Sequence, residues 1–298
     1  MSNACRGLVA LVTGASKGGT GTSLAVRLAS AGAAVAVTAR SEDGLADCVQ
    51  QVEALGGRAI ALRCDLSKPD GGREDLVARA AAELGPIDIL VNNAAGGPYQ
   101  PFIEFTRDQL VNAVELNVFA PWTLAQQALP GMRERERGWI LNVTTSVAEI
   151  PPGPPFANSG PSKTGTLYGG SKAMLNRMTV GLASEVMDQG ITVNALTPQA
   201  AILTPALQPV HDNGMIHEAM FEPLETMVEA GFALCTASQS ELHGRIAYSL
   251  DLLIELGRPV LDLHGKESVV GWQPADLPAR LAAQRAALSE GEAGGYGL

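Results

Sequence analysis

Residues 13–21 read TGASKGGTG, a glycine-rich loop between an apolar run at 8–13 and an amphipathic stretch at 22–32. The apolar run predicts a buried strand, and the periodicity after the loop predicts a helix. In an open parallel sheet, ligands bind at the carboxyl ends of the strands, and the N–H groups that open a helix can hold phosphate. The loop is therefore placed to hold a pyrophosphate. A simple tight turn is the alternative, because Thr20 replaces the lysine of a Walker A loop and the spacing is not G-x-G-x-x-G.

The rest of the chain repeats this alternation of strand and helix. Helical patterns are predicted between the strands, and no low-complexity linker divides the chain. Alternating apolar strands and helices indicate a doubly wound parallel sheet of the Rossmann type with about seven strands, in an α/β domain. We expect one domain over residues 1–265, followed by a partly disordered extension over 266–298, in which the tail 274–298 forms a terminal helix that frays into disorder. The further predicted strands are 34–39, 59–66, 87–94, 139–144, 191–198 and one beginning near 244–249.

The composition excludes several classes of function. The formal net charge of −10 argues against nucleic acid or an anionic membrane surface as the main partner. The four cysteines are scattered without a CxxC pair, which predicts reduced thiols rather than a metal site. His211 and His217 are also not spaced as a helical ligand pair, so we expect no metal. The apolar run near the start is too short for a signal peptide or a membrane span, which favours a cytoplasmic protein.

The end of the second predicted strand carries a cation. Arg40 stands where this architecture faces the adenosine ribose, and Ser41 and Lys17 are close to it along the predicted loops. Ser41 is also the predicted N-cap of the helical stretch 41–56. An acidic residue there would bind a ribose 2′-hydroxyl and repel a 2′-phosphate, whereas arginine matches phosphate geometry. NADP is therefore favoured over NAD. The alternative interpretation of Arg40 is a solvated surface charge.

Tyr168 and Lys172 are four residues apart in LYGGSKAMLNRM (167–178), so they share one helical face. A tyrosine with its ordinary pKa of about 10 is a poor proton donor and acceptor at neutral pH. A neighbouring ammonium favours the phenolate, and we expect Lys172 to lower the pKa of Tyr168.

Together these motifs resemble the short-chain dehydrogenase/reductase family over roughly residues 6–265. The resemblance rests on the order of the pieces rather than on any one of them. They are the glycine loop with Gly14, Gly19 and Gly21, CDL with Asp65, VNNAAG with Asn92 and Asn93, ELNVFAPW with Asn117, LNVTTS, Tyr168-x-x-x-Lys172, and ITVNALTP leading to Thr204.

The resemblance implies an NADP-dependent oxidoreductase that moves hydride between the cofactor and a carbonyl or secondary alcohol. Tyr168 would exchange a proton with the substrate oxygen, Lys172 would hold the nicotinamide ribose, and Asn117 would support a water relay. The implied catalytic residues are Asn117, Thr145, Tyr168 and Lys172. The implied cofactor-binding residues are Gly14, Ser16, Lys17, Gly19, Thr20, Arg40, Ser41, Asp65, Leu66, Asn93, Ala94, Tyr168, Lys172, Pro198 and Thr204.

The sequence departs from the family pattern at four places. The glycine loop has one extra residue, so that Gly18 or Gly19 is out of register. The position of the substrate-orienting serine holds Thr145, with Ser146 as the alternative next to it. A proline-rich insert at 151–165 separates these residues from Tyr168, and we expect it to form a stiff wall or flap. Gln199 stands where the family usually has glycine, with one residue more before Thr204.

Residues 205–223 correspond to the variable substrate lid of the family, where Met215, Ile216, Met220 and Phe221 indicate an apolar wall or packing against the sheet. The substrate and the direction of the reaction are not specified by these motifs. The alternative function is a catalytically inactive NADP(H)-binding regulatory or scaffold protein. By resemblance we expect a homodimer or homotetramer that associates through the helical regions 106–136 and 165–189.

Overall fold

The structure is a computed structural model that describes residues 4–151, 153, 164–205, 207–212 and 218–294. Most of the proline-rich insert lies outside these residues, as do Met215, Ile216 and His217 of the predicted lid. The predictions for those segments therefore stay predictions.

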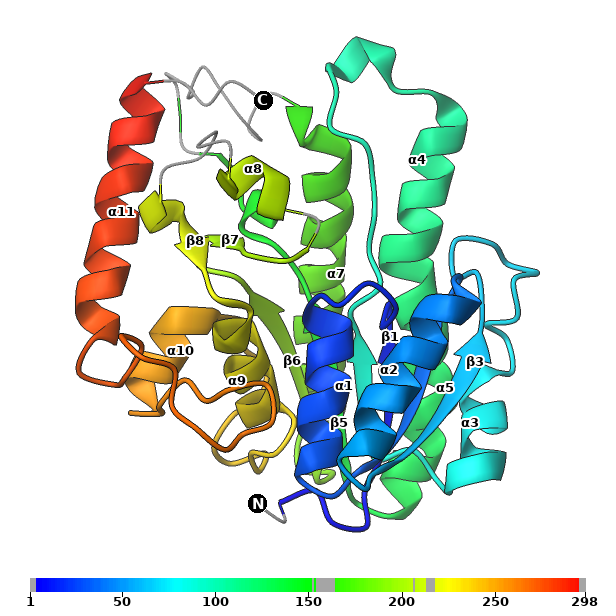
Figure 1. The fold of residues 1–298 in the computed structure, drawn as a ribbon. Helices are drawn as coiled ribbons and strands as arrows, with labels where there is room; N and C mark the ends of the chain where they lie inside the picture. Colours follow the sequence, from blue (N-terminus) through cyan, green and yellow to red (C-terminus); the bar gives the residue numbers. More distant parts are fainter. Residues whose placement is uncertain (1–3, 152, 154–163, 206, 213–217, 295–298) are drawn as a thin grey trace.

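A seven-stranded sheet forms the centre of the molecule, with every neighbouring pair of strands parallel (Figure 1). Its order is β3-β2-β1-β4-β5-β6-β9, so the order reverses at β1 and a crevice is expected beside that strand. The predicted doubly wound sheet is confirmed. The strands are β1 Val9–Thr13, β2 Ala34–Ala39, β3 Arg58–Arg63, β4 Ile89–Asn92, β5 Gly138–Val143, β6 Ile191–Thr197 and β9 Ile246–Tyr248.

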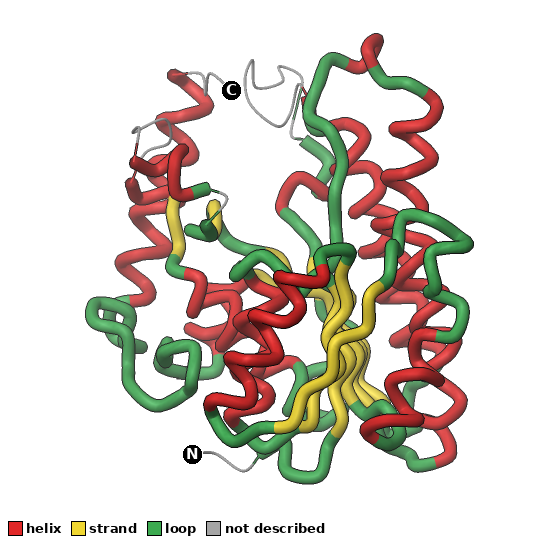
Figure 2. The backbone as a smooth tube through the Cα atoms, turned by 45° about the vertical axis from the view of Figure 1, so that its right-hand side comes forward, coloured by secondary structure: helices red, strands yellow, loops and turns green. Residues whose placement is uncertain are grey.

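Helices cover both faces of the sheet, as Figure 2 shows from the side. Alternate residues of β1 belong to different apolar clusters, with Ala10 and Val12 in one and Val9 and Leu11 in the other. This is the period of two expected of a strand that is buried on both faces. The helices of the first face are α1 Thr20–Ser30, α2 Glu42–Ala54, α9 Leu224–Leu234 and α10 Ser249–Glu255; those of the second are α3 Leu76–Leu84, α5 Ala120–Glu134 and α7 Thr166–Glu185.

The stretch predicted as helical over 106–136 contains a change of winding. Helix α4 (Arg107–Val114) begins at a capping box formed by Thr106 and Gln109. It continues into a π-helical turn, Glu115–Phe119, before α5 begins. Single π turns occur frequently at functional sites, and this one carries Asn117.

The lid region contains an arrangement that the sequence did not indicate. Strand β7 (Ala201–Ile202) pairs in parallel with β8 (Phe221–Glu222), outside the main sheet. Met220 and Phe221 are buried, at 8% and 7% exposure. The short helices α8 (Gln208–Asp212) and η4 (Glu218–Met220) belong to the same region, and the 3-10 turns η1 (Phe102–Glu104) and η3 (Ser146–Ala148) follow β4 and β5.

Helix α11 (Leu277–Gly294) lies near the end of the chain, where the sequence predicted a helix, and packs against α10 and η4. None of the helices within the described ranges is both long and apolar enough to span a bilayer.

Candidate active site

The glycine loop turns sharply from β1 into α1. Gly14 and Gly18 have positive φ values of 71° and 65°, a region that residues with a side chain rarely adopt. Gly19 instead has extended backbone at the N-cap of α1. Gly18 thus makes a left-handed turn and Gly19 is the N-cap of α1, and which of the two is out of the family register stays a prediction.

Two glycines of this loop allow the backbone to approach closely. A Cβ at Gly14 would lie 2.8 Å from the Cα of Ala94, and one at Gly21 would lie 2.7 Å from the carbonyl oxygen of Gly14. The Asn93 amide donates to the carbonyl oxygens of Thr13 and Gly14, at 2.9 and 3.3 Å. The end of β4 therefore holds the loop in place, and Asn93 acts on the loop backbone as well as on the crevice.

A cavity of about 460 Å³ lies against the loop, at the carboxyl ends of β1, β2 and β3. This is the crevice expected where the strand order reverses. Nine of the predicted cofactor-binding residues line it: Gly14, Ser16, Lys17, Arg40, Ser41, Asp65, Leu66, Asn93 and Ala94.

The cations and the carboxylate of this cavity are arranged at one end. Arg40 and Lys17 are exposed, and neither forms an ion pair with another described residue. Asp65 accepts hydrogen bonds from Ser67 Oγ at 2.6 Å and from its backbone N–H at 3.1 Å. Burial acts to raise the pKa of Asp65, but these hydrogen bonds and the charge of Arg40 outweigh it and hold the pKa below its usual value. Ser41 Oγ accepts from Gly44 N–H, which confirms its predicted role as an N-cap.

The loop after β4 connects this cavity to Tyr168. Ala94 and Ala95 line the cavity, and a Cβ at Gly97 would lie 3.5 Å from the ring atom Cδ2 of Tyr168. Between them, Gly96 donates to Asn117 Oδ1 at 3.0 Å and accepts from Asn117 Nδ2 at 2.8 Å. Asn117 also donates to Ser171 Oγ at 2.9 Å. The fully buried Asn117 thus joins the π turn, the β4 loop and α7.

Tyr168 and Lys172 lie on the first turns of α7, and their ionisation differs from what the sequence predicted. Lys172 Nζ donates to the carbonyl oxygen of Val143 at 2.7 Å, and the side chain is 1% exposed. Burial lowers the pKa of Lys172 to about 7. Burial also raises the pKa of the Tyr168 phenol, rather than the lowering we expected from a neighbouring ammonium. The expectation failed in this structure because removal from water disfavours both charged forms, and it outweighs their mutual attraction.

The loop after β5 lies directly against α7. A Cβ at Gly169 would lie within overlap distance of the Val147 carbonyl oxygen, so only glycine permits this contact. Thr145 is half-buried, and its Oγ accepts from Val147 N–H at 3.3 Å, which leaves its proton free to donate. Ser146 is exposed. The choice of Thr145 over Ser146 stays a prediction.

Thr204 lies beside the glycine loop but outside the cavity lining. A Cβ at Gly19 would lie 3.6 Å from Thr204 Cγ2, and one at Gly18 would lie 3.5 Å from Pro205 Cγ. Gly19, Thr20, Pro198 and Thr204 are not among the residues that line the cavity.

Tyr99 was missed in the sequence. Its ring centroid lies 5.6 Å from that of Tyr168, with the planes tilted by 44°, and Tyr99 is 49% exposed. No local pattern marks it, because the contact depends on the path of the loop after β4.

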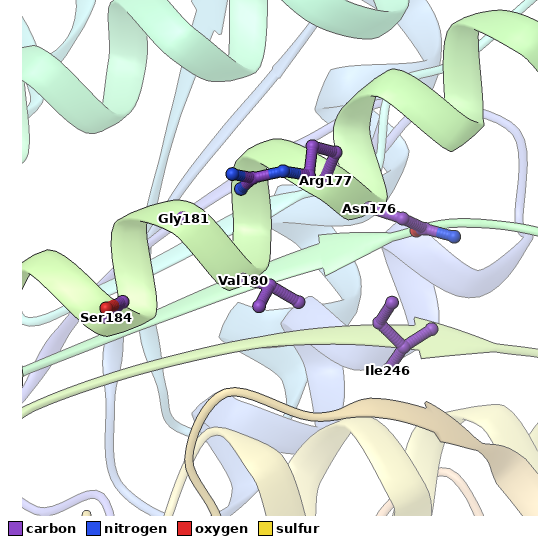
Figure 3. A pocket seen from close by; sticks show the side chains of 6 residues that line it. All are labelled: Asn176, Arg177, Val180, Gly181, Ser184 and Ile246. Atoms are coloured by element: carbon purple, nitrogen blue, oxygen red, sulfur yellow. The ribbon is translucent and has the colours of Figure 1, made fainter.

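A hollow of about 540 Å³ lies elsewhere on α7, where Val180 faces Ile246 of β9 and Arg177 extends away from them (Figure 3). It contains none of the predicted catalytic residues. A further hollow, of about 520 Å³, lies between α5 and α7 and includes Trp122 and Met174.

Among the described residues, no group of three or more histidine, cysteine or acidic side chains could hold a metal ion. All four cysteines are buried and free, and burial raises their pKa values.

Comparison with known proteins agrees with this geometry. A family model described as short chain dehydrogenase matches residues 8–213. A short chain dehydrogenase of Pseudocercospora fijiensis is 37% identical over 195 residues, and the match spans 65% of this chain but only 59% of that protein. The 7α-hydroxysteroid dehydrogenase of Escherichia coli K12 is 33% identical over 247 residues, which are 80% of this chain and 91% of the relative.

The solved structures include a 7α-hydroxysteroid dehydrogenase in complex with NADH and 7-oxo glycochenodeoxycholic acid. It superposes with a TM-score of 0.72 at 31% identity, covering 83% of this chain and 94% of that one. The range of the family model, 8–213, includes the glycine loop and the helix that carries Tyr168. The chain belongs to the short chain dehydrogenase family of oxidoreductases.

Proposed function

We propose that this protein is an NADP(H)-dependent oxidoreductase that interconverts a carbonyl group and a secondary alcohol. The observation that carries the proposal is the continuity of the site: one cavity gathers nine predicted cofactor residues, and the loop after β4 links it to Tyr168. The cofactor would supply or accept the hydride, and the protein would supply position and proton chemistry.

The residues present fit a dinucleotide. Gly14 and Gly21 leave no room for a side chain, so the loop backbone can approach a pyrophosphate as closely as the helix N-terminus allows. Asp65 would lie on the adenine side. Arg40 and Lys17 favour a 2′-phosphate on the ribose, and this distinguishes the proposal from the relative that was solved with NADH.

The catalytic roles follow from the contacts on α7. Tyr168 is the proposed proton donor and acceptor for the substrate oxygen, with Thr145 holding that oxygen by a hydrogen bond. Lys172 is anchored by Val143, and its lowered pKa allows it to gain or release a proton near neutral pH. Asn117 fixes α7 against the β4 loop, which keeps the phenol at a defined place. A water relay through Asn117 remains part of the proposal.

The substrate is proposed to carry an apolar body. Tyr99 presents half of its surface next to Tyr168, and Ile150, beyond the catalytic loop, is 93% exposed. The matched relatives include an enzyme named for a hydroxysteroid, so cyclic ketones and alcohols belong at the head of a substrate panel.

The deciding experiment measures binding first and turnover second. Calorimetry with NADPH and with NADH gives the cofactor preference, and a panel of carbonyls and alcohols then tests hydride transfer. We expect tighter binding of NADPH and turnover of at least one cyclic ketone. Binding without any hydride exchange across the panel would favour the inactive regulatory or scaffold protein instead.

We further propose a homo-oligomer formed through α5 and α7. Trp122, Met174 and Val180 are 47%, 49% and 41% exposed along these helices, and Ile246 beside them is 43% exposed. Apolar side chains in such numbers on one face are typical of an interface. Light scattering of the purified protein distinguishes a dimer or tetramer from a monomer.

A further inference from the structure

Glu222 of β8 is a fully buried carboxylate outside the proposed catalytic residues. It forms no ion pair with any other residue that the structure describes. Instead it accepts three hydrogen bonds: Oε1 from the backbone N–H of Ala200 at 2.6 Å, and Oε2 from the hydroxyls of Thr226 and Ser249 at 2.8 Å each. A buried charge without a counter-ion is costly unless such donors surround it.

Through these contacts Glu222 holds the chain that follows β6. Ser249 Oγ accepts from the backbone N–H of Gln199 at 3.0 Å while donating to Glu222, so the carboxylate orders two successive peptide groups. The backbone carbonyl of Glu222 also accepts from Leu203 N–H at 2.9 Å. Gln199 stands where the family pattern has glycine, and the segment has one residue more than the pattern. The hydrogen bonds of Glu222 therefore order a segment whose sequence differs from the family pattern.

The segment 199–204, which these bonds hold, runs between the Lys172 region and the glycine loop of the proposed site. It begins at the end of β6, where Leu196 pairs with Val143, the residue that anchors Lys172. It ends at Thr204 and Pro205, which contact the positions of Gly19 and Gly18 in the glycine loop. Because residues 199–204 lie between the anchor of Lys172 and the glycine loop, they would face the nicotinamide half of a dinucleotide that reached from the cavity to Tyr168.

We propose that Glu222 is a positioning residue that fixes residues 199–204 against the nicotinamide half of the cofactor. This inference rests on the proposed function. It concerns one half of the ligand only, because no contact joins Glu222 to the Arg40 end of the cavity. Replacing Glu222 with glutamine keeps the shape of the side chain but replaces one carboxylate oxygen with an NH₂ group, so that Thr226 and Ser249 can no longer donate to the oxygen that joined them.

The test compares two ligands in the full-length protein. We expect Glu222→Gln to weaken NADPH binding about tenfold, the scale of one lost charged hydrogen bond, with the affinity for 2′-phospho-ADP-ribose unchanged. The second ligand lacks nicotinamide, so a general loss of structure would weaken both. In kinetics, the KM for NADPH should rise by the same factor.

Ser249→Ala is a second variant that removes the bonds of Ser249 to Gln199 and Glu222 but leaves those of Glu222 to Ala200 and Thr226, and we expect the same selective loss at a smaller size. Glu229→Gln is a matched control, since Glu229 is an equally buried carboxylate but pairs with Arg27 at 2.5 Å. That variant should lower the melting temperature without changing the ratio of the two affinities.

The outcomes separate the two proposals. Equal losses for both ligands, or no loss in either variant, would overturn the role of Glu222 while leaving the proposed function in place. A wild-type protein that binds neither ligand would overturn both. If Glu222→Gln does not fold, Ser249→Ala decides by the same ratio.

Discussion

The two ends of the proposed site are built in different ways. At the Arg40 end, short segments at the carboxyl ends of β1, β2, β3 and β4 provide most of the cavity, and glycines shape the turn of the loop after β1. At the Tyr168 end, side chains reach across the fold: Asn117 bonds Ser171, Lys172 bonds Val143, and Glu222 bonds Ala200. The first end depends on backbone freedom, whereas the second depends on buried polar contacts. Substitutions at the Arg40 end should therefore affect the recognition of the cofactor, whereas the chemistry should depend on Tyr168 at the other end.

The largest effect is expected at the Tyr168 end. Tyr168→Phe should reduce turnover by about 10³-fold, the range of a lost general acid–base group, while NADPH binding is retained. Stopped-flow absorbance of NADPH with the best ketone measures the first, and calorimetry measures the second. If the variant keeps the wild-type rate, Tyr168 has no part in the mechanism, and the assignment of the chemistry to this end of the site is wrong.

At the opposite end, Arg40→Asp should change the cofactor preference. A carboxylate would repel a 2′-phosphate and accept a hydrogen bond from a 2′-hydroxyl, so the NADPH/NADH ratio of kcat/KM should fall by about 10²-fold. Turnover with saturating NADH should change little, because Arg40 lies away from α7. An unchanged ratio would show that Arg40 is only a solvated charge.

Gly21→Ala tests whether backbone proximity fixes the cavity. The new Cβ would lie 2.7 Å from the Gly14 carbonyl oxygen, and we expect a loss of about 2 kcal/mol in the free energy of unfolding together with weaker NADPH binding. Gly170→Ala on α7 is the control, since a Cβ there meets nothing within 4 Å and alanine favours the helix. Chemical denaturation measures both. Equal stability of the two variants would contradict the close approach.

The smallest effect concerns the stability cost of Lys172. Its pKa is lowered from 10.5 to about 7, so the folded protein binds fewer protons than the unfolded chain between these values, and the penalty of burial is complete below pH 7. Lys172→Met should raise the free energy of unfolding at pH 7 by about 1 kcal/mol, after loss of the hydrogen bond to Val143. The gain should shrink as the pH rises toward 10.5. Urea titrations at both ends of this range test the sign, and a gain that grows with pH would refute it.

The sequence determined the sheet, the glycine turn and most of the Arg40 cavity. Apolar runs and the glycines of the turn act over only a few residues. The strands, the N-cap at Ser41 and most of the cavity residues could therefore be predicted. Most of the proline-rich insert and residues 206 and 213–217 of the lid lie outside the described residues, so the roles predicted for these segments stay predictions.

Only the tertiary structure decided how the Tyr168 end of the site is built. Four features of the structure join residues that are distant in the chain. They are the contact of Tyr99 with Tyr168, the bonds of Asn117 from the π turn, the β7–β8 pair and the bonds of Glu222. The raised pKa of Tyr168 likewise follows from burial, which no spacing of residues reveals. The physical reason is the range of the interactions: backbone preferences act over a few residues, whereas desolvation and side-chain hydrogen bonds exist only once the whole sheet has brought their partners together.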